Sequence, residues 1–235
     1  MPSPAPLPGY AELHCLSNFS FQRGASHPKE LVARAAQLGY QALALTDECS
    51  VAGGVRAWAA AKESGLHLIV GSAFVWGDLR LVALARDAQG WGNLCEFITA
   101  ARAAAPKGQY HVGPGSPFSL LQGCELLLAP CRERMGASDF VAVSACLSSA
   151  RAQFGLNFDG HLWLAVELHL APDDSLWLAT LQRAGAALGL PLVAAGDVHM
   201  HARSRKPLQD VITAVQRGCS VAECGFALQP NAERH

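Results

Sequence analysis

Short apolar runs that could form strands alternate with Ala- and Leu-rich runs of helical character along most of the chain. Strand-like segments such as YQALAL at residues 40–45 are apolar on both faces, which is typical of a parallel sheet covered by helices. About seven such strand and helix units favour a barrel over an open sheet, although periodicity alone does not show that the sheet closes into a barrel.

The same pattern predicts the extent of each element. Gly39 ends the first helix, and Asp173 or Asp174 caps a later one. The expected helices cover residues 28–38, 51–64, 91–105, 174–188 and 207–217. The expected strands cover residues 10–16, 40–45, 66–75, 79–85, 125–129, 140–143, 162–168 and 192–195.

Composition indicates a folded chain with a sizeable core. Hydrophobic residues make up 51% of the 235 positions and charged residues 16%, a balance that argues against disorder. We expect residues 1–9 to be a flexible lead, residues 10–217 to be one domain, and residues 218–235 to begin a connection to further chain.

Charge and cysteine usage narrow the class of protein. The net charge of −1 gives no sign of nucleic-acid binding, so any DNA contact would come from a local patch or from other domains. No stretch approaches the ~18 apolar residues of a membrane span. The eight cysteines include no Cys-x-x-Cys pair, and we interpret them as reduced thiols of a cytoplasmic protein.

Polar side chains gather at expected strand ends, which share one face of a parallel barrel. Asp197 and His199 stand two residues apart, so they should point at one spot and could hold a metal or steer a phosphate. A solvated turn explains this spacing equally well. The four strand ends concerned are residues 12–17, 44–48, 143–146 and 195–201.

Each of the other polar residues also has a structural explanation. His14 could be a hydrogen-bonded core residue, and Asp47 could cap a helix that starts near Ser50. For Cys146 a small buried residue is the favoured interpretation. The joint placement on successive strand ends nevertheless favours one shared site.

Taken in order, these segments resemble the PHP (polymerase and histidinol phosphatase) family over essentially the whole chain. The resemblance implies an α/β fold, a distorted seven-stranded (βα) TIM-like barrel with a multinuclear phosphoesterase centre at its strand ends. The segments LHCLSNFSFQRGASHPKELV, ALTDECSVAGGVRAW and AAGDVHMHARSRKPLQDVITA are most similar to the branch found at the N-terminus of error-prone, damage-induced C-family DNA polymerases.

That branch implies partners that these residues do not contain. The intact protein would act in translesion synthesis with the remainder of the polymerase chain, two accessory mutagenesis proteins and the sliding clamp. DNA and Mg²⁺ would bind to the other polymerase domains.

The family's metal-binding pattern is incomplete in this chain. Leu16 and Glu48 stand where the family has histidines, and Ala73 replaces the carboxylate that bridges two metals. Arg80 occupies a further histidine position, and Arg23 stands where related domains often carry an acid.

The matches that remain are His14, Cys146, Asp197 and His199, with Asp47 in a supporting role; His111 has no aligned position. Metals a few Å apart need shared negative charge, which an alanine does not supply. We therefore expect no metal cofactor in this domain, with Arg23 and Arg80 paired to Asp47, Glu48 or Asp197. The alternative is a single Zn²⁺ or Mn²⁺ held by some of the remaining ligands and Glu48.

The favoured function is a non-catalytic PHP scaffold of an error-prone polymerase. An active metal-dependent phosphoesterase or 3′–5′ proofreading exonuclease is the alternative, and Ala73 argues against it. A free-standing structural or binding module is a third possibility, which the polar character of residues 231–235 disfavours.

Overall fold

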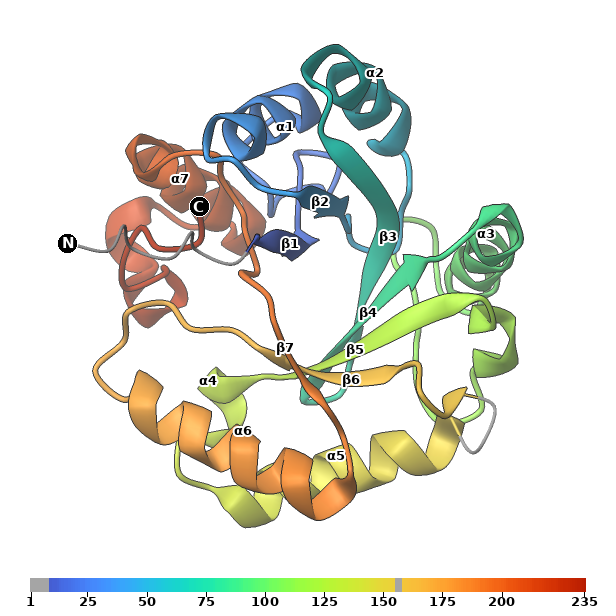
Figure 1. The fold of residues 1–235 in the computed structure, drawn as a ribbon. Coiled ribbons are helices and arrows are strands. Elements are labelled where there is room, and N and C mark those ends of the chain that lie inside the picture. The colour runs from blue at the N-terminus through green and yellow to red at the C-terminus, as the bar shows by residue number, and fades with distance from the viewer. Residues whose placement is uncertain (1–8, 155–157) are drawn as a thin grey trace, which may run out of the picture.

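The computed structural model describes residues 9–154 and 158–235, so all but one residue of the expected lead at 1–9 lies outside the described residues. One curled sheet of seven strands in chain order forms the centre of the molecule (Figure 1). Its strands are β1 (Ala11–Cys15), β2 (Ala42–Leu45), β3 (His67–Trp76), β4 (Leu79–Ala85), β5 (Cys124–Pro130), β6 (Leu162–Val166) and β7 (Leu192–Ala194).

The sheet is mixed, so the expectation of an all-parallel sheet is wrong. β4 runs antiparallel to both of its neighbours, β3 and β5, whereas the other neighbouring pairs are parallel. Only Gly77 and Asp78 separate β3 from β4, and a two-residue loop can only join antiparallel strands. Gly77 has a φ of 57°, a conformation that glycine adopts without strain.

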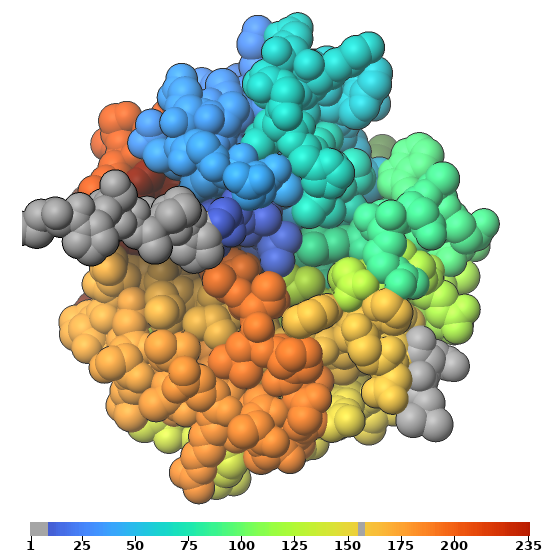
Figure 2. All heavy atoms as spheres, in the orientation of Figure 1, coloured from blue at the N-terminus to red at the C-terminus, as the bar shows by residue number. Residues whose placement is uncertain are grey.

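The two edges of the sheet meet where the chain leaves β1 and β7. Cys15 forms a parallel bridge with Val198, whose N–H donates to the carbonyl of His14 at 2.9 Å. On the N-terminal side of this bridge, the buried carboxylate of Glu12 accepts a hydrogen bond from the N–H of Gly196 at 2.8 Å. Figure 2 shows the blue atoms of the first strand directly against the orange atoms around β7. The barrel therefore closes at the ends that carry the polar motifs.

Helices surround the sheet on its outer side (Figure 1). Residues 140–143, expected to be a strand, are the first turn of a helix instead. Val143, Leu147, Ala150 and Phe154 are all buried, a helical spacing that the short apolar run FVAV does not reveal. The helices are α1 (Pro28–Gln37), α2 (Gly54–Ser64), α3 (Ala88–Ala103), α4 (Arg132–Met135), α5 (Phe140–Phe154), α6 (Asp174–Leu188) and α7 (Lys206–Arg217).

Small and branched side chains fill the barrel interior. Ala73, Val82 and Leu127 belong to one buried cluster that takes members from every strand or from the residue directly after it. Because successive side chains of a strand point to opposite faces, the residues adjacent to these interior ones in each strand point outward and pack against the helices. The interior is thus a packed core, which leaves the strand ends as the place for a site. No helix within residues 9–154 and 158–235 is long and apolar enough to cross a membrane.

Candidate functional site

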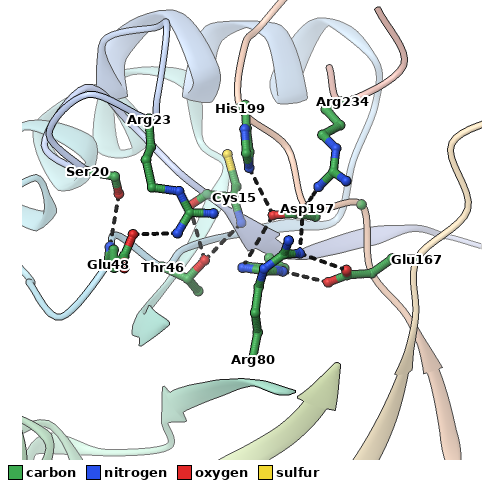
Figure 3. Close-up of polar contacts among 12 residues, drawn as sticks. Cys15, Ser20, Arg23, Thr46, Glu48, Arg80, Glu167, Asp197, His199 and Arg234 are labelled. Atoms are coloured by element: carbon green, nitrogen blue, oxygen red, sulfur yellow. Dashed lines mark hydrogen bonds and ion pairs between the residues drawn. The ribbon is translucent and has the colours of Figure 1, made fainter. Parts of the chain in front are cut away.

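Buried acids and histidines converge where the barrel closes (Figure 3). Asp197 is fully buried, and its Oδ1 lies 3.0 Å from Nε2 of His199 and 3.7 Å from Nε2 of His14. On the other side of its ring, Nδ1 of His14 lies 2.6 Å from Oε1 of Glu167. The structure brings Asp197 and His199 together, as expected, but Asp197 has a φ of 45°, so the contact does not arise from the alternation of an extended strand.

Arginine side chains supply the positive charge of this cluster. Nη1 of Arg80 lies 2.7 Å from Oδ2 of Asp197 and 3.5 Å from Oε2 of Glu167. The guanidinium of Arg234, only 4% exposed as a residue, contacts the same carboxylate oxygen of Asp197 and also Glu133 at 2.9 Å. Figure 3 shows both guanidinium groups directed at Asp197.

The direction of β4 explains how Arg80 reaches the site. Arg80 is the second residue of β4, and an antiparallel strand starts at the edge where its parallel neighbours end. A side chain at the start of β4 therefore lies among the C-terminal ends of the other strands.

A second ion pair lies beside the first group. Arg23 pairs with Glu48, which also accepts a 2.6 Å hydrogen bond from the hydroxyl of Tyr110. Burial alone would raise the pKa of Glu48, but Arg23 and Tyr110 outweigh burial and lower it. Glu48 forms a parallel backbone bridge with Ala73, so the Arg23–Glu48 pair lies next to the position where the resemblance implies a bridging carboxylate.

Protonation states follow from these neighbours. Burial would raise the pKa of Glu167, but His14, Arg80 and Arg234 lower it to about 2, so the side chain is anionic at neutral pH. Burial, followed by Arg23 and Arg80, holds the pKa of His199 well below its usual value, so this imidazole is neutral. Three arginines thus pair with Glu48, Glu167 and Asp197, and one of them, Arg234, also pairs with Glu133.

Asp47 supports the loop that carries Arg23. Its carboxylate accepts the N–H and the hydroxyl of Ser17, both at 2.8 Å, and the hydroxyl of Ser20 at 2.7 Å. α2 begins only after Gly53 and has no side-chain cap, so Asp47 does not cap this helix. Neither Arg23 nor Arg80 pairs with Asp47. Arg23 forms its ion pair with Glu48, and Arg80 forms ion pairs with Asp197 and Glu167.

Cys146 lies outside this cluster, which corrects the expectation that it ends a strand in the site. It sits in the middle of α5 and lines a separate pocket with Trp76 and Asp78. The cysteine that directly follows a strand here is Cys131, after β5, and it lines the same pocket as Arg80. His111 lies in the segment after α3 and lines a different pocket.

Comparison with known proteins decides the family of this chain. The family model for the PHP domain matches residues 12–142, more than half of the sequence. The chain belongs to the PHP domain family. Two solved structures share this fold: an amidohydrolase from Chromobacterium violaceum and a protein named as a metal-dependent phosphoesterase from Bifidobacterium adolescentis. Their TM-scores are 0.60 and 0.53, each at 17% identity, over 82% and 84% of this chain and 88% and 90% of theirs. The expected distorted barrel is confirmed.

The sequence relatives of this PHP domain are much longer proteins. The error-prone DNA polymerase of Dechloromonas aromatica is 52% identical over 97% of this chain and 22% of its own length. That of Methylococcus capsulatus is 52% identical over 96% of this chain and 21% of its own length. The chain therefore spans about a fifth of the length of these relatives.

The residues of this PHP domain do not fit the multinuclear metal centre that the family implies. Nε2 of His14 and Nδ1 of His199 are buried without a hydrogen-bond partner and could face a ligand. The carboxylates, however, are engaged: Asp197 by two guanidinium groups and Glu48 by a third. In the described part of the chain, no group of three or more His, Cys, Asp or Glu side chains is arranged to hold a metal ion.

Two residues of this site, Glu167 and Arg234, are not among the site residues predicted from the sequence. Glu167 directly follows β6, so the strand-end rule would have found it had that strand been ended at residue 166 rather than 168. Arg234 carries no such signal, because it lies in an irregular segment after α7. Only the tertiary structure brings this segment to the barrel: the N–H groups of His199 and Met200 both donate to the carbonyl of Arg234.

Proposed function

We propose that this PHP domain is a non-catalytic structural scaffold of an error-prone DNA polymerase. The observation that carries the proposal is the cluster in which Arg23, Arg80 and Arg234 pair with the carboxylates of Glu48, Glu167 and Asp197. The carboxylates of Glu48, Glu167 and Asp197 already have the charged partners that stabilise them in a buried site. A divalent cation would have to displace these guanidinium groups from the carboxylates or bind beside their positive charge.

The likeness to error-prone polymerases supports the wider role. In this proposal the whole protein acts in the bacterial cytoplasm, in translesion synthesis and DNA-damage-induced mutagenesis. Its partners are the remainder of the polymerase chain, accessory mutagenesis proteins and the sliding clamp. DNA and Mg²⁺ bind to the other polymerase domains, and the PHP domain itself needs no metal cofactor.

One observation favours a second candidate, a metal-dependent phosphoesterase or 3′–5′ exonuclease. The two unpartnered ring nitrogens, Nε2 of His14 and Nδ1 of His199, are suitable ligands for a single Zn²⁺ or Mn²⁺. This candidate lacks the bridging carboxylate at Ala73, and Arg80 stands close to the carboxylate of Asp197 that would have to join the histidines.

Metal content and hydrolysis decide between the two. We expect the purified protein, after dialysis against Zn²⁺ and Mn²⁺, to retain no stoichiometric metal by mass spectrometry. It should neither hydrolyse p-nitrophenyl phosphate nor shorten a primer. Stoichiometric metal and turnover that both disappear in His199→Gln would overturn the scaffold. The control for that outcome is His67→Gln, which changes an exposed histidine at the start of β3 and should leave any bound metal and turnover unchanged.

A further inference from the structure

The last helix, α7, has one strongly apolar face. Leu208, Val211, Ile212 and Val215 follow one another at the three- and four-residue spacing that places side chains on one side of a helix. In a globular protein such a face is normally turned toward the core. α1 follows this rule, because its buried side chains include the apolar residues Leu31 and Val32.

In α7 the orientation is reversed. Leu208 is 40% exposed, Val211 48% and Val215 60%. The buried side consists instead of Gln209, 4% exposed, and Ala214. The side-chain oxygen of Gln209 is buried without a hydrogen-bond partner. This helix therefore turns its polar side toward the rest of the described chain and its apolar side away from it.

Such an orientation is unfavourable for a helix that stays in water. Each exposed branched side chain forgoes the burial that stabilises an amphipathic helix. A contiguous apolar surface on an otherwise polar exterior is typical of an interaction site. Two more apolar side chains after α7, Val221 at 39% and Phe226 at 109%, are also exposed.

We propose that the α7 face, defined as Leu208, Val211, Ile212 and Val215, docks against the polymerase body of the same polypeptide. This rests on the proposed function, because the polymerase is the partner. The relatives contain about four-fifths of their length outside the region matched here. Glu233 pairs with Arg203, which lies three residues before α7, so a chain continuing from residue 235 would start near this helix. Figure 1 shows the C-terminus beside α7.

The size of the face favours a tethered partner over a second copy of the chain. A helix of 12 residues is roughly 18 Å long, and one face of it is small against the ~1,600 Å² of a standard interface. A partner in the same polypeptide needs less area, because the linker raises its effective concentration. The apolar side chains at this spacing match the anchors of a helix bound in an apolar groove.

The test uses the full-length polymerase that contains this domain, with Val211→Lys as the variant. Val141→Lys on α5 is the matched control, since Val141 is 75% exposed. If the α7 face is docked, Val211→Lys should accelerate hydrogen exchange of α7 and of one segment of the polymerase body. We expect about tenfold, the effect of losing the burial of roughly one valine. Val141→Lys should exchange like the wild type.

Three outcomes would overturn the docking proposal. Exchange in the polymerase body could be unchanged by Val211→Lys, or both lysine variants could behave alike. A dimeric polymerase that becomes monomeric only in Val211→Lys would assign the face to a second copy. Metal content, measured in the same preparations, separates the two proposals: stoichiometric zinc or manganese would overturn the scaffold and leave the docking result standing.

Discussion

At the scale of single residues, the positive charge of the site belongs to guanidinium groups of the chain itself. A guanidinium group offers two parallel N–H groups to a carboxylate and remains charged under all physiological conditions. Arg234 illustrates this: burial and the nearby Arg80 lower its pKa to about 10, which still leaves it cationic at neutral pH. The cost of burying Asp197 as an anion is thus offset within the chain.

Removing one of these cations should be costly. Arg80→Met leaves Glu167 and Asp197 buried with one partner fewer, and breaking a buried pair costs about 3–5 kcal/mol. We expect a loss of about 3 kcal/mol in the free energy of unfolding, measured by urea titration. Arg203→Met is the control, because Arg203 is 61% exposed in its pair with Glu233 and should lose under about 0.5 kcal/mol. Equal losses would show that Arg80 acts only as a surface charge.

At the scale of elements, close backbone approach positions α3 against the sheet. A Cβ atom on Gly90 in the first turn of α3 would lie 2.1 Å from the carbonyl oxygen of Gly123, just before β5. The N–H of Gly90 also donates to the capping carboxylate of Asp87 at 2.8 Å. Gly92 lies in the same helix, and nothing stands within 4 Å of the place where its Cβ would be.

The two glycines should therefore respond oppositely to the same substitution. Gly90→Ala forces α3 away from the loop before β5 and should destabilise the chain by about 1–3 kcal/mol. Gly92→Ala should stabilise it by about 0.5–1 kcal/mol, since alanine favours helix more than glycine. Thermal unfolding followed by circular dichroism measures both. Stabilisation by both variants would mean that α3 does not pack as closely as the structure shows.

At the scale of the whole molecule, the cluster makes folding sensitive to acid. The pKa of Glu167 in the fold, about 2, lies below its ordinary 4.5, so its contribution is present above pH 4.5 and is lost as the pH falls toward 2. Burial lowers the pKa of His199 well below 6.5, so below pH 6.5 the unfolded chain takes up this proton first. Both groups thus destabilise the fold on acidification, His199 at the higher pH.

The contribution of His199 can be isolated by comparison with His199→Gln. Between pH 6.5 and pH 5 the wild type should lose up to about 1.4 kcal/mol more per pH unit than the variant, which has no proton to gain. Urea unfolding of both proteins at several pH values measures the difference. Burial also lowers the pKa of His169, so the pH dependence of the wild type alone would not show which of the two histidines causes the loss of stability. Parallel pH profiles would contradict a neutral, buried His199.

Many strands and helices of this molecule could be predicted because the spacing of apolar residues in the sequence reflects which side chains are buried. The helix expected at 174–188 has those bounds in the structure. The six strands and helices expected between residues 10 and 85 all begin and end within three residues of the expectation. The convergence of Asp197 and His199 was also expected, but it arises in the segment after β7, where Asp197 has a φ of 45°, and not from the alternation of an extended strand. The run at 140–143 failed because four apolar residues are too few to separate a strand from a helix.

The sequence by itself therefore determined most of the strands and helices, with residues 140–143 as an exception, and that polar residues meet where the barrel closes. Only the tertiary structure decided that Arg80 at the start of β4 pairs with Asp197, that the segment after α7 brings Arg234 to the same carboxylate, and that the apolar face of α7 points outward. The reason is physical: periodicity reports that a side chain will be buried, but its partner is set by contacts between residues far apart in the chain. Arg80 and Asp197, 117 residues apart, are such a pair.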